Sequence, residues 1–378
     1  MKKSLLFLFI LIINIVCSPR IVNLIQKDAW PSFRGNHLNS GVARESLSLP
    51  LHLSNLWHLN GTIRSTIAAN GDYLYIGDWS GAISCINIFT GKVEWQAKTG
   101  GYLTGSATLV KDRFIIGSCD SSIYAFSLEN GKQLWKFPTK KLIVASPQVK
   151  DNLVICGSND NNLYALDWRD GQLKWKLKTG GLISSTAALY GDKLYVGSGE
   201  GALYCVNIKD GKVIWKFPTG KIVVASPLIA ENMIFFGDYT GTFHALDLHT
   251  GEEIWKVHCP KKIDASATYA DGKIFWADMS GNLYAAVAKN GKPLWQFPAG
   301  GPILSSPLAD PQHIIFARYS KGRIYVLNQE NGNLLWTFGL DGDVYASPVI
   351  YRGTLYIGTE KGKLYAFSSG DEKTANSQ

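Results

Sequence analysis

The sequence predicts an all-β fold, an eight-bladed β-propeller, from three observations. A tryptophan recurs about every 40 residues, a turn ending in glycine precedes seven of the eight repeated tryptophans, and two runs of alternating apolar and polar residues lie before each turn. Such alternation over four to eight residues indicates strands, and a four-stranded repeat of this length is typical of one propeller blade. Helical repeats are excluded, because no apolar stripe of helical period appears.

The tryptophans set the period of the repeat. Intervals of 38, 40, 40, 40, 40, 40 and 41 residues separate Trp57, Trp95, Trp135, Trp175, Trp215, Trp255, Trp295 and Trp336. The dipeptides that precede them, from Thr90-Gly91 to Asn331-Gly332, are typical of tight β-turns. The last of the four antiparallel strands in each blade therefore carries the tryptophan.

The hairpins give the number of blades. Their second strands pass through eight positions, namely Ser84, Tyr124, Tyr164, Tyr204, His244, Tyr284, Tyr325 and Tyr365. The last hairpin has no tryptophan strand after it, and Trp57 has no hairpin before it. We expect the N-terminal Trp57 strand to complete the last blade, because a closed ring leaves no exposed sheet edge.

A column of hydroxyl residues marks the first strand of every unit. Its members are Thr66, Ser106, Ser146, Ser185, Ser226, Ser266, Ser306 and Ser347, and proline follows four of them, at Pro147, Pro227, Pro307 and Pro348. Proline is tolerated in edge strands, so the first strand is predicted to be innermost, lining the axis, and the tryptophan strand outermost. The hydroxyls are expected to satisfy backbone groups between blades.

The N-terminus predicts export. Met1-Lys2-Lys3 precedes an apolar run that ends at Cys17, which is typical of a signal peptide spanning residues 1–17. Cys17 is a candidate for lipidation, and cleavage by an ordinary signal peptidase or retention as an anchor are the alternatives. We expect a leader at residues 18–50, the propeller at 51–370 and a disordered tail at 371–378. The predicted location is the periplasm or the outer membrane.

Charge and cysteine content exclude some functions. The net charge of +8 is spread along the chain and not packed into one run, so no nucleic-acid partner is predicted. Cys85, Cys156 and Cys205 fall in repeat columns of core residues, whereas Cys119 and Cys259 fall in predicted loops. The sequence therefore assigns no disulfide.

These columns resemble the PQQ-like repeat family, in which a hydroxyl-proline pair opens each blade and a turn-Gly-x-x-x-Trp closes it. The resemblance covers residues 57–367, and the leader Trp30-Pro31-Ser32-Phe33-Arg34-Gly35-Asn36 resembles the segment before the first blade in exported members. The family includes quinoprotein dehydrogenases, which bind PQQ on the axis. It also includes the outer-membrane protein assembly factor BamB, which has no cofactor and binds the barrel-insertion machinery.

The sequence departs from the dehydrogenases of this family. Those enzymes stack PQQ against a disulfide of adjacent cysteines, hold Ca²⁺ with Glu, Asn and Asp, and build the pocket from long insertions. Here no two cysteines are adjacent, and the tryptophans from Trp95 onward stay within one residue of a 40-residue interval. No Cys-x-x-Cys-His, Gly-x-Ser-x-Gly or metal-ligand spacing of histidines appears, so no catalytic residue and no metal site are predicted.

The resemblance thus implies a non-enzymatic, monomeric scaffold with a BamB-like role in outer-membrane protein assembly. No cofactor is expected in that role, and the partners would be membrane or periplasmic proteins, among them the outer-membrane barrel assembly machinery. The alternative is a periplasmic dehydrogenase of alcohols or sugars that depends on PQQ and Ca²⁺.

The loops on one face of the predicted ring are ionic. Lysines follow the outermost strands, at Lys98, Lys140, Lys141, Lys178, Lys221, Lys261 and Lys262, and acids lie between the second and third strands, at Asp78, Asp120, Asp160, Glu200, Asp238, Asp278 and Glu360. Within this rim, a ring two residues before the hydroxyl column should face the mouth of the channel: Arg64, Thr104, Val144, Ile183, Val224, Asp264, Leu304 and Tyr345. Interleaved charges would orient a protein partner.

Six residues of this face are the candidate partner-binding residues. The resemblance to BamB, whose partner contacts basic and acidic loops on adjacent blades, suggests Lys221 and Asp264. Trp79 and Tyr239 are loop aromatics without an evident core position, and Trp and Tyr are enriched at binding hot spots. The predicted mouth adds Arg64 and Tyr345.

Overall fold

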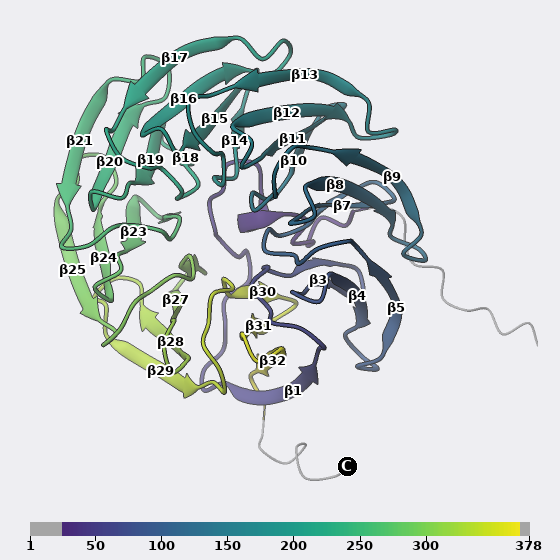
Figure 1. Cartoon of the computed structure of the whole chain (residues 1–378). Coiled ribbons are helices and arrows are strands. Elements are labelled where there is room, and N and C mark those ends of the chain that lie inside the picture. Colours follow the sequence, from purple (N-terminus) through teal and green to yellow (C-terminus); the bar gives the residue numbers. More distant parts are fainter. Residues whose placement is uncertain (1–24, 371–378) are drawn as a thin grey trace, which may run out of the picture.

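The computed structural model describes residues 25–370, which form eight four-stranded antiparallel sheets around one axis (Figure 1). The predicted eight-bladed β-propeller is confirmed, with the first strand of each blade innermost and the tryptophan strand outermost. The predicted signal segment with Cys17 and the predicted tail at 371–378 lie outside the described residues.

Each blade consists of four short strands. Blades 1 to 3 are β2 (Ala68–Asn70), β3 (Tyr73–Gly77), β4 (Ala82–Asn87) and β5 (Val93–Lys98); β6 (Thr108–Val110), β7 (Arg113–Ser118), β8 (Ser122–Ser127) and β9 (Gln133–Pro138); and β10 (Gln148–Lys150), β11 (Leu153–Gly157), β12 (Asn162–Asp167) and β13 (Leu173–Lys178). Blades 4 to 6 are β14 (Ala188–Tyr190), β15 (Lys193–Ser198), β16 (Ala202–Asn207) and β17 (Val213–Pro218); β18 (Leu228–Ala230), β19 (Met233–Gly237), β20 (Thr242–Asp247) and β21 (Glu253–His258); and β22 (Thr268–Ala270), β23 (Lys273–Ala277), β24 (Asn282–Val287) and β25 (Pro293–Pro298). Blade 7 is β26 (Leu308–Ala309), β27 (His313–Arg318), β28 (Arg323–Asn328) and β29 (Leu334–Gly339).

The eighth blade joins the first and the last strands of the described chain, as predicted. It contains β30 (Val349–Tyr351), β31 (Thr354–Gly358), β32 (Lys363–Ser368) and, as its outermost strand, β1 (His52–His58). β1 pairs antiparallel with β32, with Trp57 opposite Leu364. The N-terminal strand therefore covers an edge that would otherwise be open to pairing with another chain.

The repeated tryptophans and turn glycines hold neighbouring blades together. Each of the eight indole Nε1 groups donates to a backbone carbonyl of the next blade, over 2.8 to 3.1 Å. From Gly131 onward, the glycine of the next turn has a positive φ and lies so close to the indole that a Cβ would approach it within 2.8 Å, as at Gly211 above Trp175. Glycine is thus required for its backbone conformation and for this close approach.

Hydroxyl groups form a second connection, around the axis. The backbone N–H groups of seven hydroxyl residues each donate to the hydroxyl of the next blade, in successive bonds of 2.8 to 3.0 Å that begin at the N–H of Thr66 and end at the hydroxyl of Ser347. The ring member of blade 4 is Thr186, so the prediction of Ser185 was wrong by one residue. Ser185 instead accepts a hydrogen bond from the backbone N–H of Gly197. The hydroxyl residues also precede the inner strands and do not lie within them.

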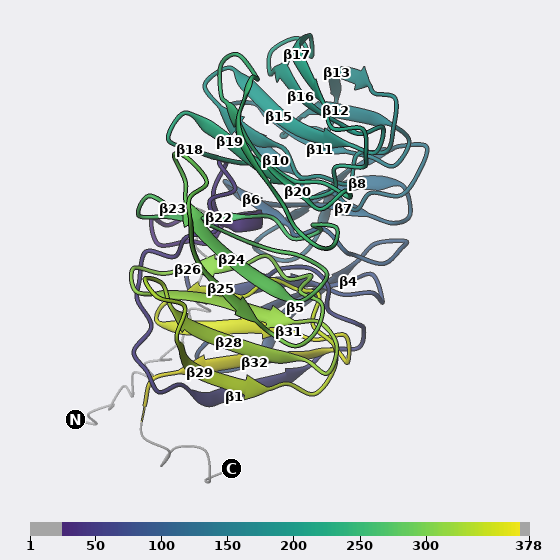
Figure 2. The same ribbon diagram turned by 90° about the vertical axis from the view of Figure 1, so that its left-hand side faces the viewer.

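The leader packs across the ring (Figures 1 and 2, purple). Its backbone bonds to inner strands at Trp30 (β2), Pro31 (β6), His37 (β14), Leu38 (β18), Ser40 (β22) and Gly41 and Ala43 (β26). It includes one short 3-10 helix, η1 (Phe33–Gly35). Farther along, the backbone N–H of Leu47 donates to the fully buried carboxylate of Asp310. The leader therefore connects blades that are distant in sequence.

The core is apolar and contains the repeat columns that the sequence assigned to it. Cys85, Cys156 and Cys205 are buried within it, as predicted, and the five cysteines of the described residues are free thiols. Cys259 lies in the loop after β21 (Glu253–His258), as predicted, and it is buried there and accepts a hydrogen bond from the Trp276 indole. Among residues 25–370, no helix is long and apolar enough to cross a membrane.

Candidate functional site

The propeller has two unlike faces. On one of them, which we call the mouth face, the loops that follow the outermost strands contact the loops between second and third strands; for example, the backbone N–H of Thr99 donates to Gly81 O and that of Leu103 to Asp78 O. The leader lies against the opposite face, which we call the leader face, where the inner strands turn back (Figure 2). The described residues thus leave the mouth face open around the axis.

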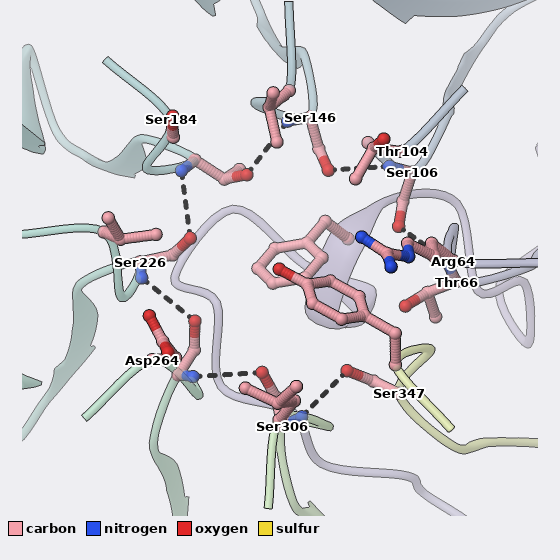
Figure 3. Close-up of a pocket in the computed structure, with 18 residues that line it drawn as sticks. Arg64, Thr66, Thr104, Ser106, Ser146, Ser184, Ser226, Asp264, Ser306 and Ser347 are labelled. Carbon is pink, nitrogen blue, oxygen red and sulfur yellow. Dashed lines mark hydrogen bonds between the residues drawn. The ribbon is translucent and has the colours of Figure 1, made fainter. Parts of the chain in front are cut away.

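A small depression marks the axis on the mouth face (Figure 3). Its volume is about 90 Å³, its wall is the hydroxyl ring, and Phe33 of the leader lines it from within the channel. The upper rim is Arg64, Thr104, Val144, Ser184, Val224, Asp264, Leu304 and Tyr345. The predicted rim is confirmed except at Ile183, which is fully buried; Ser184 takes its place, following the same one-residue shift as Thr186.

The leader fills the other end of the axis. Arg34 is buried and donates to the carbonyl oxygens of Pro307 and Ala267 and to the hydroxyl of Thr268. Burial lowers the pKa of this guanidinium to about 9. The axial channel is therefore occupied by side chains of the leader below the depression.

Arg64 organises the first cluster at the mouth. Its guanidinium carbon lies 4.1 Å from the ring centroid of Trp79 and 4.9 Å from that of Tyr345, and its Nε donates to the Glu360 carboxylate over 2.6 Å. The ring of Tyr102 lies 5.2 Å from that of Trp79. Trp79 and Tyr102 remain 36% and 44% exposed. Cation–π contacts thus hold partly exposed aromatic rings beside the axis.

Tyr239 and Asp264 form the second cluster. Lys262 lies 3.0 Å from the Asp264 carboxylate and 4.1 Å from the ring centroid of Tyr239. Burial, followed by a hydrogen bond with Asp264, raises the pKa of Tyr239. Burial and then the Asp264 charge also raise the pKa of Tyr345, which links the two clusters across the depression.

The structure brings together five of the six predicted partner-binding residues. Lys221 is the exception: its side chain is exposed, and the ion-pair partner of Asp264 within the described residues is Lys262. Sequence reasoning missed Tyr102. Tyr102 follows two glycines in the loop after β5. An aromatic residue in such a loop has no evident core position, and this feature could have identified it.

The acidic loops of the mouth face are largely structural. Asp78, Asp238 and Asp278 are at most 2% exposed and accept hydrogen bonds within their own loops. Asp120, Asp160 and Glu200 accept backbone N–H bonds from the loop of the preceding blade, at Gly100, Lys140 and Gly180. The rim therefore does not have the predicted alternation of solvated positive and negative charges, because most of its carboxylates accept hydrogen bonds from the loops of the propeller.

Comparison with known proteins places the chain in a family. The sequence profile of "Beta-alanine-activating enzyme, beta-propeller" matches residues 61–369. The chain belongs to this β-propeller family. No curated protein matches the chain significantly.

Solved structures share the propeller of this family member. BamB from Moraxella catarrhalis is 16% identical with a TM-score of 0.75, over 85% of this chain and 100% of that one. A quinohemoprotein alcohol dehydrogenase from Comamonas testosteroni is 14% identical with a TM-score of 0.81, over 93% and 82%. A europium-containing methanol dehydrogenase is 12% identical with a TM-score of 0.80, over 90% and 98%. At these identities the similarity shows the fold alone.

The axis of this propeller does not fit PQQ and Ca²⁺. The depression of about 90 Å³ is smaller than a cavity of roughly 150 Å³ that holds benzene. Its lining has one carboxylate, Asp264, which is paired with Lys262, whereas Ca²⁺ takes six to eight oxygen ligands. Within residues 25–370, no group of three or more His, Cys, Asp or Glu side chains is placed to hold a metal ion.

Proposed function

We propose that the chain is an exported scaffold protein that binds a membrane or periplasmic protein through its mouth face, in a BamB-like role in outer-membrane protein assembly. The observation that carries this proposal is the cluster of Arg64, Trp79 and Tyr102 at the axis. Trp, Tyr and Arg are the residues most enriched at protein-binding hot spots. Here they form one contiguous and partly exposed group.

The preorganisation of this group supports a docking role. Arg64 is fixed by the Glu360 carboxylate on one side and by two aromatic rings on the others, so its side chain loses little conformational freedom when a partner covers it. The leader face is already occupied by the leader backbone. Of the two ends of the ring, the mouth face is consequently the one that residues 25–370 leave uncovered.

The second candidate function is that of a dehydrogenase dependent on PQQ and Ca²⁺. The observation in its favour is the similarity of the fold to two dehydrogenase structures, with TM-scores of 0.80 and 0.81. The size and donor set of the axial depression favour the scaffold. Phe33 of the leader lines the depression on the axis, where the resemblance to the dehydrogenases implies that PQQ would lie.

Capture from outer-membrane extracts tests the proposal. The immobilised chain should retain outer-membrane assembly proteins that mass spectrometry identifies, and the double variant Trp79→Ala, Tyr102→Ala should retain at least about 10-fold less, as expected for hot-spot residues. The matched control is Leu134→Ala, Leu173→Ala, because these side chains are similarly exposed, at 41% and 44%, on the outermost strands.

The competing function makes the opposite prediction. If the chain were a dehydrogenase, it would reduce a redox dye when supplied with PQQ, Ca²⁺ and an alcohol, and the two double variants would capture the same proteins. Either result would overturn the scaffold proposal. Circular dichroism of both variants checks that the propeller remains folded.

A further inference from the structure

Exposed lysines gather on one arc of the mouth face. They are Lys98, Lys140, Lys141, Lys178, Lys221 and Lys261, and they stand at the end of the outermost strand or in the following loop of five consecutive blades, from β5 to β21. None of these six forms an ion pair with another described residue, although Lys262 beside them is paired with Asp264. We call these six residues the basic crescent.

The acids of the same loops do not neutralise the crescent. Asp78 and Asp238 are buried, and each accepts from the backbone and hydroxyl of the loop that it closes. Asp160 accepts from the backbone N–H of Lys140 and from the Tyr164 hydroxyl, so it binds the loop and not the lysine side chain. The carboxylates therefore build the loops, and the ammonium groups remain in solvent.

We propose that the basic crescent binds an acidic segment of the partner polypeptide. This inference rests on the proposed scaffold function and adds the chemistry of its partner. Uncompensated lysines raise the local potential, attract acidic surfaces and speed the formation of an encounter complex. The aromatic cluster at Trp79 and Tyr102 lies beside the blade 1 end of the crescent. One end of an acidic segment that lies along the crescent would thus contact the rings of Trp79 and Tyr102.

A polypeptide fits this surface better than a polyanion does. Glu360 and Asp264, which are 20% and 12% exposed and paired with Arg64 and Lys262, belong to blades 8 and 6 beyond the ends of the arc, so a ligand that extends from the lysines to these blades meets mixed charge there and not a uniformly basic surface. An acidic segment can direct an apolar or basic residue at these two carboxylates and place its own carboxylates over the lysines. The exposed aromatic rings are also suited to side-chain packing against a protein.

Charge-matched variants test the proposal. The crescent variant changes Lys98, Lys140, Lys141, Lys178, Lys221 and Lys261 to Gln. The control variant changes to Gln six exposed lysines in turns on the leader face, namely Lys92, Lys132, Lys209, Lys212, Lys289 and Lys292. Each variant loses six positive charges, so both have the same net charge. Among the twelve lysines, Lys212 alone is in an ion pair with another described residue, Asp210.

The probe is a synthetic peptide of Glu and Tyr residues, compared with its Gln and Tyr counterpart, in surface plasmon resonance over a salt series. The full chain and the control variant should bind the Glu peptide with an association rate that falls steeply with salt. The crescent variant should associate at least about 10-fold more slowly at low salt and depend weakly on salt. The Gln peptide should bind all three proteins weakly.

Four results would overturn the inference, and the last of them leaves the scaffold function in place. The first is equal association of the crescent and control variants, and the second is the absence of Glu-peptide binding by the full chain. The third is tighter crescent-dependent binding to phosphatidylglycerol vesicles or oligothymidylate than to the peptide, which would assign the lysines to a membrane or a nucleic acid. If the crescent variant still captures the outer-membrane assembly proteins that the Trp79→Ala, Tyr102→Ala variant loses, the scaffold function stands and the acidic-segment inference falls.

Discussion

Replacement of Gly211 by alanine tests the contact between tryptophan and glycine that joins neighbouring blades. Gly211 has a φ of +72°, and a Cβ there would lie 2.6 Å from Cε3 of Trp175 in the preceding blade. Left-handed backbone costs a residue with a Cβ roughly 1–2 kcal/mol. The overlap forces the indole to move, away from its 2.8 Å hydrogen bond to Ile208 O, and overpacking of this kind costs about 1–3 kcal/mol more.

Gly272 provides the matched control. Its φ is +73°, and nothing lies within 4 Å of the Cβ position. Gly272→Ala should therefore show the backbone cost alone, and Gly211→Ala should be less stable by a further amount of about 1–3 kcal/mol. Urea unfolding of the two variants and the unchanged chain, followed by tryptophan fluorescence, measures both differences. Equal stability of the two variants would refute the idea that glycine is required for close packing on the tryptophan.

Three further predictions concern closure, the hydroxyl ring and pH. A chain lacking residues up to and including Trp57 should aggregate or melt at a markedly lower temperature, because β32 then has an open edge; a monomer with an unchanged melting temperature would contradict closure by β1. Thr186→Val should cost about 1–3 kcal/mol in urea unfolding, because the buried N–H of Ser146 loses its acceptor, whereas Ser184→Ala at the mouth should cost less; equal losses would contradict the ring. Burial raises the pKa of Asp310, but hydrogen bonds from His313 and from the backbone N–H of Leu47 outweigh it, so that the pKa lies below its ordinary value. The stabilisation of the fold by the Asp310 carboxylate is present above the unfolded pKa of about 3.9 and lost as the pH falls through the folded pKa. Acid should therefore lower the urea midpoint of the unchanged chain more than that of Asp310→Asn. Parallel curves of urea midpoint against pH would contradict this.

Periodic positions made most of the fold predictable from the sequence. Trp57 without a hairpin, and a last hairpin without a tryptophan, predicted the ring closure that β1 and β32 provide. The rim residues Arg64 and Tyr345 followed from their distance to the hydroxyl column, and the structure places both at the depression. Repeats allow such predictions because every unit packs against its neighbours in the same way and therefore has similar residues at equivalent positions.

What the sequence did not predict depends on neighbours that are distant or ambiguous. Ser185 and Thr186 both carry hydroxyls, so the column could be continued through either, and the bond to Ser226 across the blade boundary decides between them. Burial of Asp78 and its role inside its loop depend on the backbone path, which residue type alone does not specify. The leader has no periodicity that would have predicted its path across the axis.

Photo-cross-linking from the mouth face in intact cells tests the central claim, that this propeller is a protein-binding scaffold, most directly. A photoreactive amino acid is placed at Tyr102, which is 44% exposed beside Trp79, and in a second chain at Leu134, which is 41% exposed on the outermost strand β9. Position 102, and not position 134, should form a discrete adduct with an outer-membrane or periplasmic assembly protein, and the crescent variant should reduce its yield. Identical adducts from both positions, or none from position 102 while the chain reduces a dye with PQQ, would contradict the claim.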